Sequence, residues 1–113
     1  MGLVKGIPEV DPGSAADRLA TGEAVALDVR EVDEWAAGRI PGALHIPLDE
    51  LNRRQADIPS GRPIIAVCRS GSRSAAVTEA LLRAGYQAEN LAGGMKAWKA
   101  AGLGIDPPDG WIA

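Results

Sequence analysis

The chain has 113 residues, enough for one compact domain, and 46% of them are hydrophobic, so a buried core can form. Its formal net charge of −3 gives no support for the basic patch of a nucleic-acid-binding protein or the polybasic segment of a membrane-surface protein. The single cysteine excludes an intramolecular disulfide. One cysteine and one histidine also lack the paired spacings of zinc ligands, so we expect no metal site.

Residues 1–6 are too few and too polar for a secretory signal, and no apolar run approaches the length that spans a membrane. Without such signals, we expect a cytoplasmic protein. We expect residues 1–113 to form a single domain with its core over about 7–105. Residues 106–113 are rich in proline and aspartate and are predicted to be a loosely held tail, onto which Trp111 and Ile112 can dock.

In the first half of the chain, short apolar runs alternate with amphipathic, alanine-rich stretches. Asp11 and Pro12 predict a helix start, because aspartate caps a first turn and proline fits the first helical position. Residues 24–29 are nearly all apolar, as in a strand buried on both faces. The strands expected here are 7–10, 24–29 and 43–46. The helices expected here are 12–20, 31–37 and 49–56, the first closed by Gly22 and the second by Gly38.

The second half of the chain continues this alternation. Residues 63–67 are predicted to be a buried strand, and residues 74–84 a helix with apolar positions at Ala76, Ala80, Leu81 and Ala84. A strand over 88–91 and a helix over 95–101 follow. Alternating strands and helices predict an α/β domain with a mostly parallel sheet. Ligands of such sheets bind beyond the carboxyl ends of the strands, which here are residues 28–30 and Cys68 onward.

Cys68 lies where the predicted strand 63–67 ends, and a short polar loop separates it from the next helix. Such a loop can curl so that its backbone N–H groups point inward and bind an anion, with help from the positive end of the helix. Gly71 permits backbone angles that other residues resist. The other candidate ligands for an anion are the hydroxyls and guanidinium groups of Arg69, Ser70, Ser72, Arg73 and Ser74.

The thiol of Cys68 has two interpretations. A free cysteine has a pKa of about 8.5, which a helix N-terminus or nearby cations lower to roughly 3.5–7.5, so in this loop Cys68 is expected to be largely thiolate at neutral pH. The same donors would stabilise a persulfide anion and orient an anionic sulfur donor such as thiosulfate. Alternatively, a lone cysteine after a strand is a small buried hydrophobe without chemistry. The residues alone leave both interpretations open, with the neighbouring arginines favouring the first.

Four motifs, in order, resemble the landmarks of the rhodanese family over roughly residues 7–105. They are residues 27–31 (LDVRE), 38–47 (GRIPGALHIP), 68–74 (CRSGSRS) and 91–98 (LAGGMKAW). The resemblance implies a three-layer α/β domain with a mostly parallel, five-stranded central sheet flanked by helices. It also implies transfer of a sulfane sulfur through a cysteine persulfide, without a cofactor. Cys68 takes the catalytic role, residues 69–73 bind the substrate, and Ser74 supports them.

The enzyme implied by the resemblance is a thiosulfate sulfurtransferase. Its donor would be a small sulfur anion, and its acceptor cyanide in an assay, or a thiol or a protein in the cell. Because Cys68 is the only cysteine, the acceptor has to be external. One alternative is a sulfur carrier or regulatory module of the same fold with little turnover. Another is a small phosphatase or arsenate reductase, but these use Cys-x5-Arg, whereas four residues separate Cys68 from Arg73 and residue 74 is serine.

Asp28 and Arg30, after another buried strand, are candidates for supporting residues. They could brace the loop or meet the substrate, but a fold-holding ion pair is the favoured interpretation, since such networks often lack a direct catalytic role. His45 could act as a base, and is interpreted instead as a packed strand residue. Trp35 and Trp98 lie in predicted helices and are interpreted as core residues.

Overall fold

The computed structural model describes residues 6–113. The expectation that the chain begins without a secretory signal, and the first five residues of the expected domain, lie outside this range. Within it, none of the helices is both long and apolar enough to cross a membrane.

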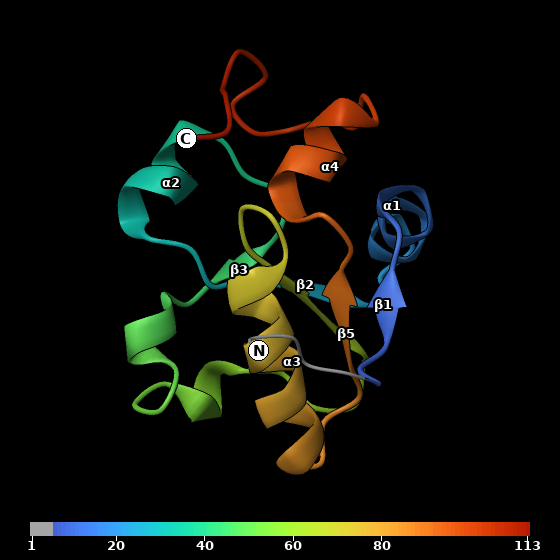
Figure 1. The fold of residues 1–113 in the computed structure, drawn as a ribbon, viewed down its shortest axis with the longest axis vertical. Coiled ribbons are helices and arrows are strands. Elements are labelled where there is room, and N and C mark those ends of the chain that lie inside the picture. The colour runs from blue at the N-terminus through green and yellow to red at the C-terminus, as the bar shows by residue number, and fades with distance from the viewer. Residues whose placement is uncertain (1–5) are drawn as a thin grey trace.

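Five strands of the described chain form one sheet, and every neighbouring pair is parallel (Figure 1). The strands are β1 (Glu9–Val10), β2 (Val25–Asp28), β3 (Leu44–His45), β4 (Ile64–Val67) and β5 (Ala88–Leu91). Their order across the sheet is β1-β5-β4-β2-β3, which places β4 at the centre. The predicted five-stranded α/β class is confirmed, and the central position explains why every residue of β4 is apolar and buried.

The helices of the described chain are α1 (Pro12–Ala20), α2 (Val32–Ala37), α3 (Ser72–Arg83) and α4 (Gly94–Ala100). Of these, α1 and α2 begin at a side-chain cap, and α3 and α4 begin after a glycine. Asp11 caps α1, because its carboxylate accepts a hydrogen bond from the Ser14 N–H at 3.2 Å. α2 starts with a capping box in which the Glu31 N–H donates to Glu34 Oε1 at 2.9 Å. α3 begins at Ser72 rather than at the predicted residue 74.

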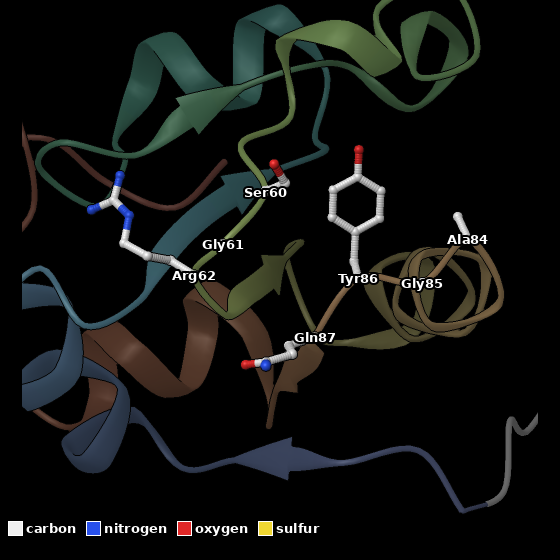
Figure 2. Close-up of a pocket in the computed structure, with 7 residues that line it drawn as sticks. All are labelled: Ser60, Gly61, Arg62, Ala84, Gly85, Tyr86 and Gln87. Atoms are coloured by element: carbon white, nitrogen blue, oxygen red, sulfur yellow. The ribbon is translucent and has the colours of Figure 1, made fainter.

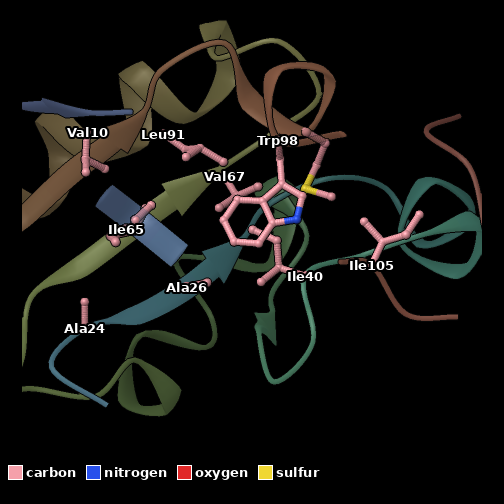
Figure 3. Close-up of a cluster of buried hydrophobic side chains, with 11 residues drawn as sticks. Val10, Ala24, Ala26, Ile40, Ile65, Val67, Leu91, Trp98 and Ile105 are labelled. Atoms are coloured by element: carbon pink, nitrogen blue, oxygen red, sulfur yellow. The ribbon is translucent and has the colours of Figure 1, made fainter. Parts of the chain in front are cut away.

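Two apolar clusters lie on opposite faces of the sheet and make the fold three-layered. On one face, Met95 and Trp98 of α4 pack with side chains from α1 and the sheet (Figure 3). On the other face, Val77 and Leu81 of α3 pack against the sheet, and Cys68 belongs to this cluster. The predicted core position of Trp98 is confirmed, since it is buried.

The prediction of a helix over residues 49–56 is wrong. Two short 3-10 segments, η1 (Leu48–Glu50) and η2 (Gln55–Asp57), take its place. Leu51 between them is only half-buried, and the side chains of Asn52 and Arg53 are exposed. Without an apolar stripe to bury, this stretch forms single turns instead of a continuous helix.

α3 turns a partly polar side to the sheet. Ser74 and Thr78 are buried there together with Val77 and Leu81, so the predicted apolar face is correct only at Leu81. The alanines of the predicted face lie on the outer side of α3 and, with η1 and η2, line an apolar groove of about 280 Å³: Ala76, Ala80 and Ala84.

The C-terminal tail is joined to the rest of the fold, in contrast to the loosely held tail predicted for residues 106–113. The backbones of Arg39 and Asp106 exchange hydrogen bonds at 3.1 and 2.9 Å, and the Trp111 N–H donates to Ala37 O at 3.0 Å. Ile112 packs against the α4-side cluster, whereas the Trp111 side chain is exposed.

The carboxyl ends of β2 and β4 lie side by side, because the Val29 N–H donates to Val67 O at 3.0 Å. This register brings residues 28–30 next to Cys68, as the sheet rule predicts. A hollow of about 370 Å³ lies instead at the amino ends of β4 and β5, lined by Arg62, Tyr86 and their neighbours (Figure 2). Residues 28–30 and Cys68, the two candidate regions from the sequence, therefore lie at the opposite ends of the strands from this hollow.

Candidate active site

Cys68 directly follows the central strand β4 and has 0% exposed surface. The next three residues form a loop that ends at Gly71, the N-cap of α3. Gly71 has φ +105°, in the left-handed region that favours glycine, so the predicted need for glycine here is confirmed. The turn at Gly71 directs the first N–H groups of α3 back toward the sulfur.

Hydrogen-bond donors from this loop and the first turn of α3 converge on the sulfur of Cys68. The Gly71 N–H donates to Sγ at 3.1 Å and the Ser74 N–H at 3.3 Å. The Ser74 hydroxyl is a further donor within reach of Sγ, at 3.2 Å. We call this set of donors around Sγ the sulfur nest. It is the inward-pointing arrangement that the sequence predicts, and it suits a negatively charged sulfur.

The pKa of the Cys68 thiol is lowered from its usual value. Burial raises it, because a buried charge loses its hydration, but hydrogen bonds from the Ser74 hydroxyl and from the N–H groups of Ser74, Gly71 and Ser70 outweigh this effect. The direction agrees with the expectation of a cysteine that readily becomes a thiolate.

The two arginines of the motif at residues 68–74 make their hydrogen bonds away from the sulfur, although the sequence places them among the groups that favour a thiolate. Arg73 donates to both carboxylate oxygens of Glu34 at 2.9 and 2.8 Å, and so joins α3 to α2. These bonds lower the pKa of Glu34 to about 2, against the opposite effect of burial. Arg69 Nε donates to Ala113 O at 2.8 Å and so joins the loop to the tail.

The three serines of the motif at residues 68–74 differ in what they contribute. Ser70 and Ser72 are exposed, and in residues 6–113 neither hydroxyl donates to Sγ. Ser70 acts on the sulfur through its backbone N–H. Ser74, which the sequence marks only as a supporting residue, is fully buried and contributes both its N–H and its hydroxyl.

The N-terminus of α4 holds the loop from outside. The Met95 N–H donates to Cys68 O at 2.9 Å, and the Lys96 N–H to Arg69 O at 3.0 Å. Gly94 makes this close approach possible, since a Cβ there would lie 2.5 Å from Cys68 O and 2.6 Å from Arg69 O. The motif at residues 91–98 therefore contacts the motif at residues 68–74, which the sequence had not indicated.

Asn90, in β5, is the polar residue that sequence reasoning missed. Its side chain is 1% exposed, and its Nδ2 donates to Gly71 O at 3.0 Å. Its Oδ1 accepts from the Ser74 hydroxyl at 2.6 Å. The one available signal was an asparagine inside an otherwise buried strand, because such a polar group needs partners.

Asp28 and Arg30 form a buried ion pair whose closest atoms are 2.7 Å apart. Each nitrogen of the Arg30 guanidinium has an acceptor: Nε and Nη2 donate to Asp28, Nη2 also donates to Gly38 O at 2.8 Å, and Nη1 donates to Glu34 O at 3.3 Å. Asp28 Oδ1 also accepts from the Arg30 N–H at 3.0 Å. These contacts join β2 to α2 and support the bracing interpretation.

His45 lies away from the sulfur nest. Its Nε2 is 2.8 Å from Arg30 O, and its ring stacks on Trp35 with centroids 4.5 Å apart. Trp35 is half-buried, and the Arg39 guanidinium lies over its ring, 5.1 Å from the centroid. The predicted core position of Trp35 is therefore only partly correct. Among residues 6–113, no group of three or more histidine, cysteine, aspartate or glutamate side chains is arranged to hold a metal ion.

Comparison with known proteins gives one consistent match. A family model described as rhodanese-like domain matches residues 11–101. A sulfurtransferase of Allochromatium vinosum is 41% identical over 106 residues, which cover 92% of this chain and 99% of that protein. A thiosulfate sulfurtransferase of Actinobacillus succinogenes is 30% identical, with 87% and 89% covered. The crystal structure of a rhodanese-related protein from Thermoplasma volcanium superposes with a TM-score of 0.82 at 26% identity, covering 87% of this chain and 96% of that one.

Proposed function

The chain belongs to the rhodanese-like domain family, and on this premise we propose that it is a sulfurtransferase that carries a sulfane sulfur as a persulfide on Cys68. The observation that carries the proposal is the convergence of the Gly71 and Ser74 donors on a buried sulfur. A nest of this kind stabilises an anionic sulfur and gives a core cysteine no advantage.

The proposed first step loads the cysteine from a small anionic donor such as thiosulfate. The Cys68 thiolate attacks the outer sulfur of the donor. A bond forms between Sγ and that sulfur, the donor's own sulfur–sulfur bond breaks, and sulfite leaves with the electron pair. Total charge is conserved, and the terminal sulfur of the persulfide carries the negative charge that Sγ has lost.

The proposed second step passes the sulfur to a thiophilic acceptor. The acceptor bonds to the terminal sulfur, the bond to Sγ breaks, and the electron pair returns to Sγ as a thiolate. No second cysteine lies in the printed sequence, so the acceptor is proposed to be a separate thiol or protein, with cyanide as its substitute in an assay. A cytoplasmic setting, as the sequence predicts, would supply such thiols in reduced form.

Arg69 and Arg73 are proposed to attract the donor rather than to activate the thiol. Arg69 is exposed, and its hydrogen bond to Ala113 O is made through Nε, so the outer Nη groups of its guanidinium are proposed to face an approaching anion. Arg73 shares its charge with Glu34. Activation of Sγ is assigned to the neutral donors of the sulfur nest, which lie within hydrogen-bond distance of it.

The thiosulfate:cyanide assay tests the proposal. We expect the wild type to form thiocyanate and Cys68→Ala to form none above the uncatalysed rate. Ser60→Ala, in the hollow at the other end of the sheet, is the matched control and should keep the wild-type rate. Full activity in Cys68→Ala would contradict the proposal. A wild type that becomes persulfidated but does not turn over would instead be a sulfur carrier or regulatory module.

A further inference from the structure

The orientation of the Asn90 side-chain amide is fixed by its partners. Nδ2 lies 3.0 Å from Gly71 O and 3.2 Å from Glu9 Oε2, and both of these atoms are acceptors. A flipped amide would place Oδ1 against two acceptors, so the NH₂ group has to face them. Asn90 Oδ1 is therefore turned toward the Ser74 hydroxyl and can only accept a hydrogen bond from it.

The Ser74 hydroxyl has two acceptors and one proton. Its oxygen lies 2.6 Å from Asn90 Oδ1 and 3.2 Å from Cys68 Sγ. A serine hydroxyl donates one hydrogen bond, so it can satisfy only one of these atoms at a time. Both serine and asparagine are buried, so leaving either acceptor without this hydrogen bond costs free energy. The charge on Sγ decides the balance, because a charged acceptor takes the stronger bond.

We propose that the Ser74 hydroxyl is a switched hydrogen-bond donor and that Asn90 is the positioning residue that receives it whenever Sγ is uncharged. When Cys68 is a thiolate, the hydroxyl donates to Sγ. When Cys68 is a thiol or a persulfide, Sγ is neutral and the hydroxyl donates to Asn90 Oδ1. The inference deepens the proposed sulfur transfer and, as far as the persulfide is concerned, rests on it.

The switch follows the movement of charge through the proposed cycle. During loading, charge leaves Sγ for the terminal sulfur, and the hydroxyl turns to Asn90. During discharge, the electron pair returns to Sγ as the sulfur–sulfur bond breaks, and the hydroxyl turns back to stabilise the leaving thiolate. The N–H groups of Gly71 and Ser74 are fixed in the backbone and cannot turn in this way, so the hydroxyl is the donor in the nest that can respond to the charge.

The charged groups around the switch come from four elements and are the same in every variant below. Glu9 of β1 accepts from Asn90 Nδ2, and Arg73 of α3 is paired with Glu34 of α2. Arg69 lies in the loop and bonds to the tail. Substitutions at Ser74 and Asn90 replace neutral side chains with neutral side chains, so a change in the titration of Cys68 reports the hydrogen bonds.

The first test is the rate of Cys68 alkylation by iodoacetamide as a function of pH. Ser74→Ala should move the inflection to higher pH and slow alkylation at pH 7 by about tenfold, since one hydrogen bond to a charged group is lost. Ser74→Thr keeps the hydroxyl and should restore the wild-type profile. Asn90→Leu removes the competing acceptor and should move the inflection to lower pH. In a Ser74→Ala background, Asn90→Leu should have no further effect.

An equal shift from Asn90→Leu in both backgrounds would overturn the proposal, because Asn90 would then act only by bracing the loop through Gly71. The proposal would also be overturned if Asn90→Leu moved the alkylation inflection to higher pH in the protein that keeps Ser74. A readout that needs no Asn90 variant keeps the test available if Asn90→Leu does not fold. The ¹³Cγ chemical shift of Asn90 should follow the Cys68 titration in the wild type and lose most of that dependence in Ser74→Ala. Equal titration in both proteins would contradict the switch.

Neither measurement contains a sulfur donor, so the switch and the proposed function fail separately. If the alkylation profiles behave as expected and no persulfide forms, sulfur transfer is wrong and the switch remains. If a persulfide forms and Ser74→Ala matches the wild type in both the alkylation profile and the rate of discharge to cyanide, the switch is wrong and sulfur transfer remains.

Discussion

Cys68 and the Asp28–Arg30 pair occupy the carboxyl ends of neighbouring strands, and all three side chains are buried, but their hydrogen bonds are arranged differently. Each guanidinium nitrogen of Arg30 has a protein acceptor, and Asp28 receives both side-chain and backbone donors from Arg30. The sulfur of Cys68 instead shares its hydroxyl donor with Asn90.

The difference separates a group that holds the fold from a group that can react. A buried ion pair with every partner in place has one arrangement, and any change leaves a charge uncompensated. The sulfur nest tolerates two charge states, because its backbone donors favour an anion and its hydroxyl has a second acceptor. Burial and proximity to the loop are common to both regions and do not distinguish them, whereas the state of their hydrogen bonds does.

The largest expected effect comes from breaking the ion pair. Arg30→Met leaves the buried Asp28 carboxylate without its partner and should lower the free energy of unfolding by about 3–5 kcal/mol, measured by urea denaturation. Arg83→Met removes a pair of the same type on the surface, where Arg83 and Glu79 are 3.3 Å apart and exposed, and should cost less than about 1 kcal/mol.

The same variant tests whether Arg30 takes part in catalysis. Thiocyanate formation per folded Arg30→Met molecule, assayed at low temperature, should stay within a few-fold of the wild type. A stability loss below about 1 kcal/mol, together with loss of activity in the folded fraction, would assign Arg30 to the chemistry and remove the contrast between the two regions.

A smaller effect should come from the contact between α4 and the loop. Gly94→Ala puts a Cβ against the Cys68 and Arg69 carbonyls at a residue with φ +61°. Gly102 has φ +77° and no atom within 4 Å of such a Cβ, so Gly102→Ala carries backbone strain alone and should cost about 1–2 kcal/mol. Gly94→Ala should cost about 1–3 kcal/mol more, because of the steric clash.

Gly94→Ala should also slow the alkylation of Cys68 at neutral pH, because the carbonyls that it displaces belong to the loop that positions the nest. Gly102→Ala should leave the alkylation rate unchanged. Equal stability and equal alkylation rates in the two variants would show that α4 does not hold the loop.

The smallest expected effect is at the Glu34–Arg73 pair. Glu34→Gln should lower the free energy of unfolding by about 1 kcal/mol at pH 7, less than the roughly 3 kcal/mol that the full pKa shift corresponds to, because glutamine keeps an acceptor for Arg73 and the Arg73 side chain is 34% exposed to screening solvent. Because Arg73 lowers the pKa of Glu34 from 4.5 to about 2, this contribution is complete above pH 4.5 and is lost as the pH falls toward 2. The gap between wild type and Glu34→Gln, measured by urea denaturation at several pH values, should therefore close in acid. A gap that stays constant down to pH 2 would contradict the assigned pKa.

Glu34→Gln also tests whether Arg73 contributes to the activation of Sγ. The alkylation profile of Cys68 should shift far less in Glu34→Gln than in Ser74→Ala, because Arg73 does not donate to Sγ. A larger shift in Glu34→Gln would give Arg73 the activating role that the sequence suggested.

Local signals predicted the elements whose ends carry caps or whose residues are continuously apolar. Asp11 and Pro12 marked the start of α1, and the apolar run before Cys68 marked β4, because both depend on neighbouring residues. Residues 49–56 failed because helix-compatible residues without an apolar stripe do not form a helix without tertiary support. The tail failed because composition does not show that Trp111 pairs with the backbone of Ala37.

The candidate site divides in the same way. The loop from Cys68 to Ser74 is contiguous, so its geometry could be anticipated from a strand end, a glycine and a helix start. Asn90 and Gly94 come from other elements and reach the loop only because β5 lies beside β4. The pairing of Arg73 with Glu34 instead of Sγ could not be predicted either, because Glu34 lies 39 residues away in sequence.

The central claim is that Cys68 carries sulfur, and the intact mass of the protein after treatment with thiosulfate tests it most directly. The wild type should gain one sulfur atom, about 32 Da, and lose it again on addition of cyanide. Cys68→Ser, which keeps the size of the side chain but not the thiolate, should gain nothing. No mass gain in the wild type at saturating donor, or the same gain in Cys68→Ser, would contradict the account.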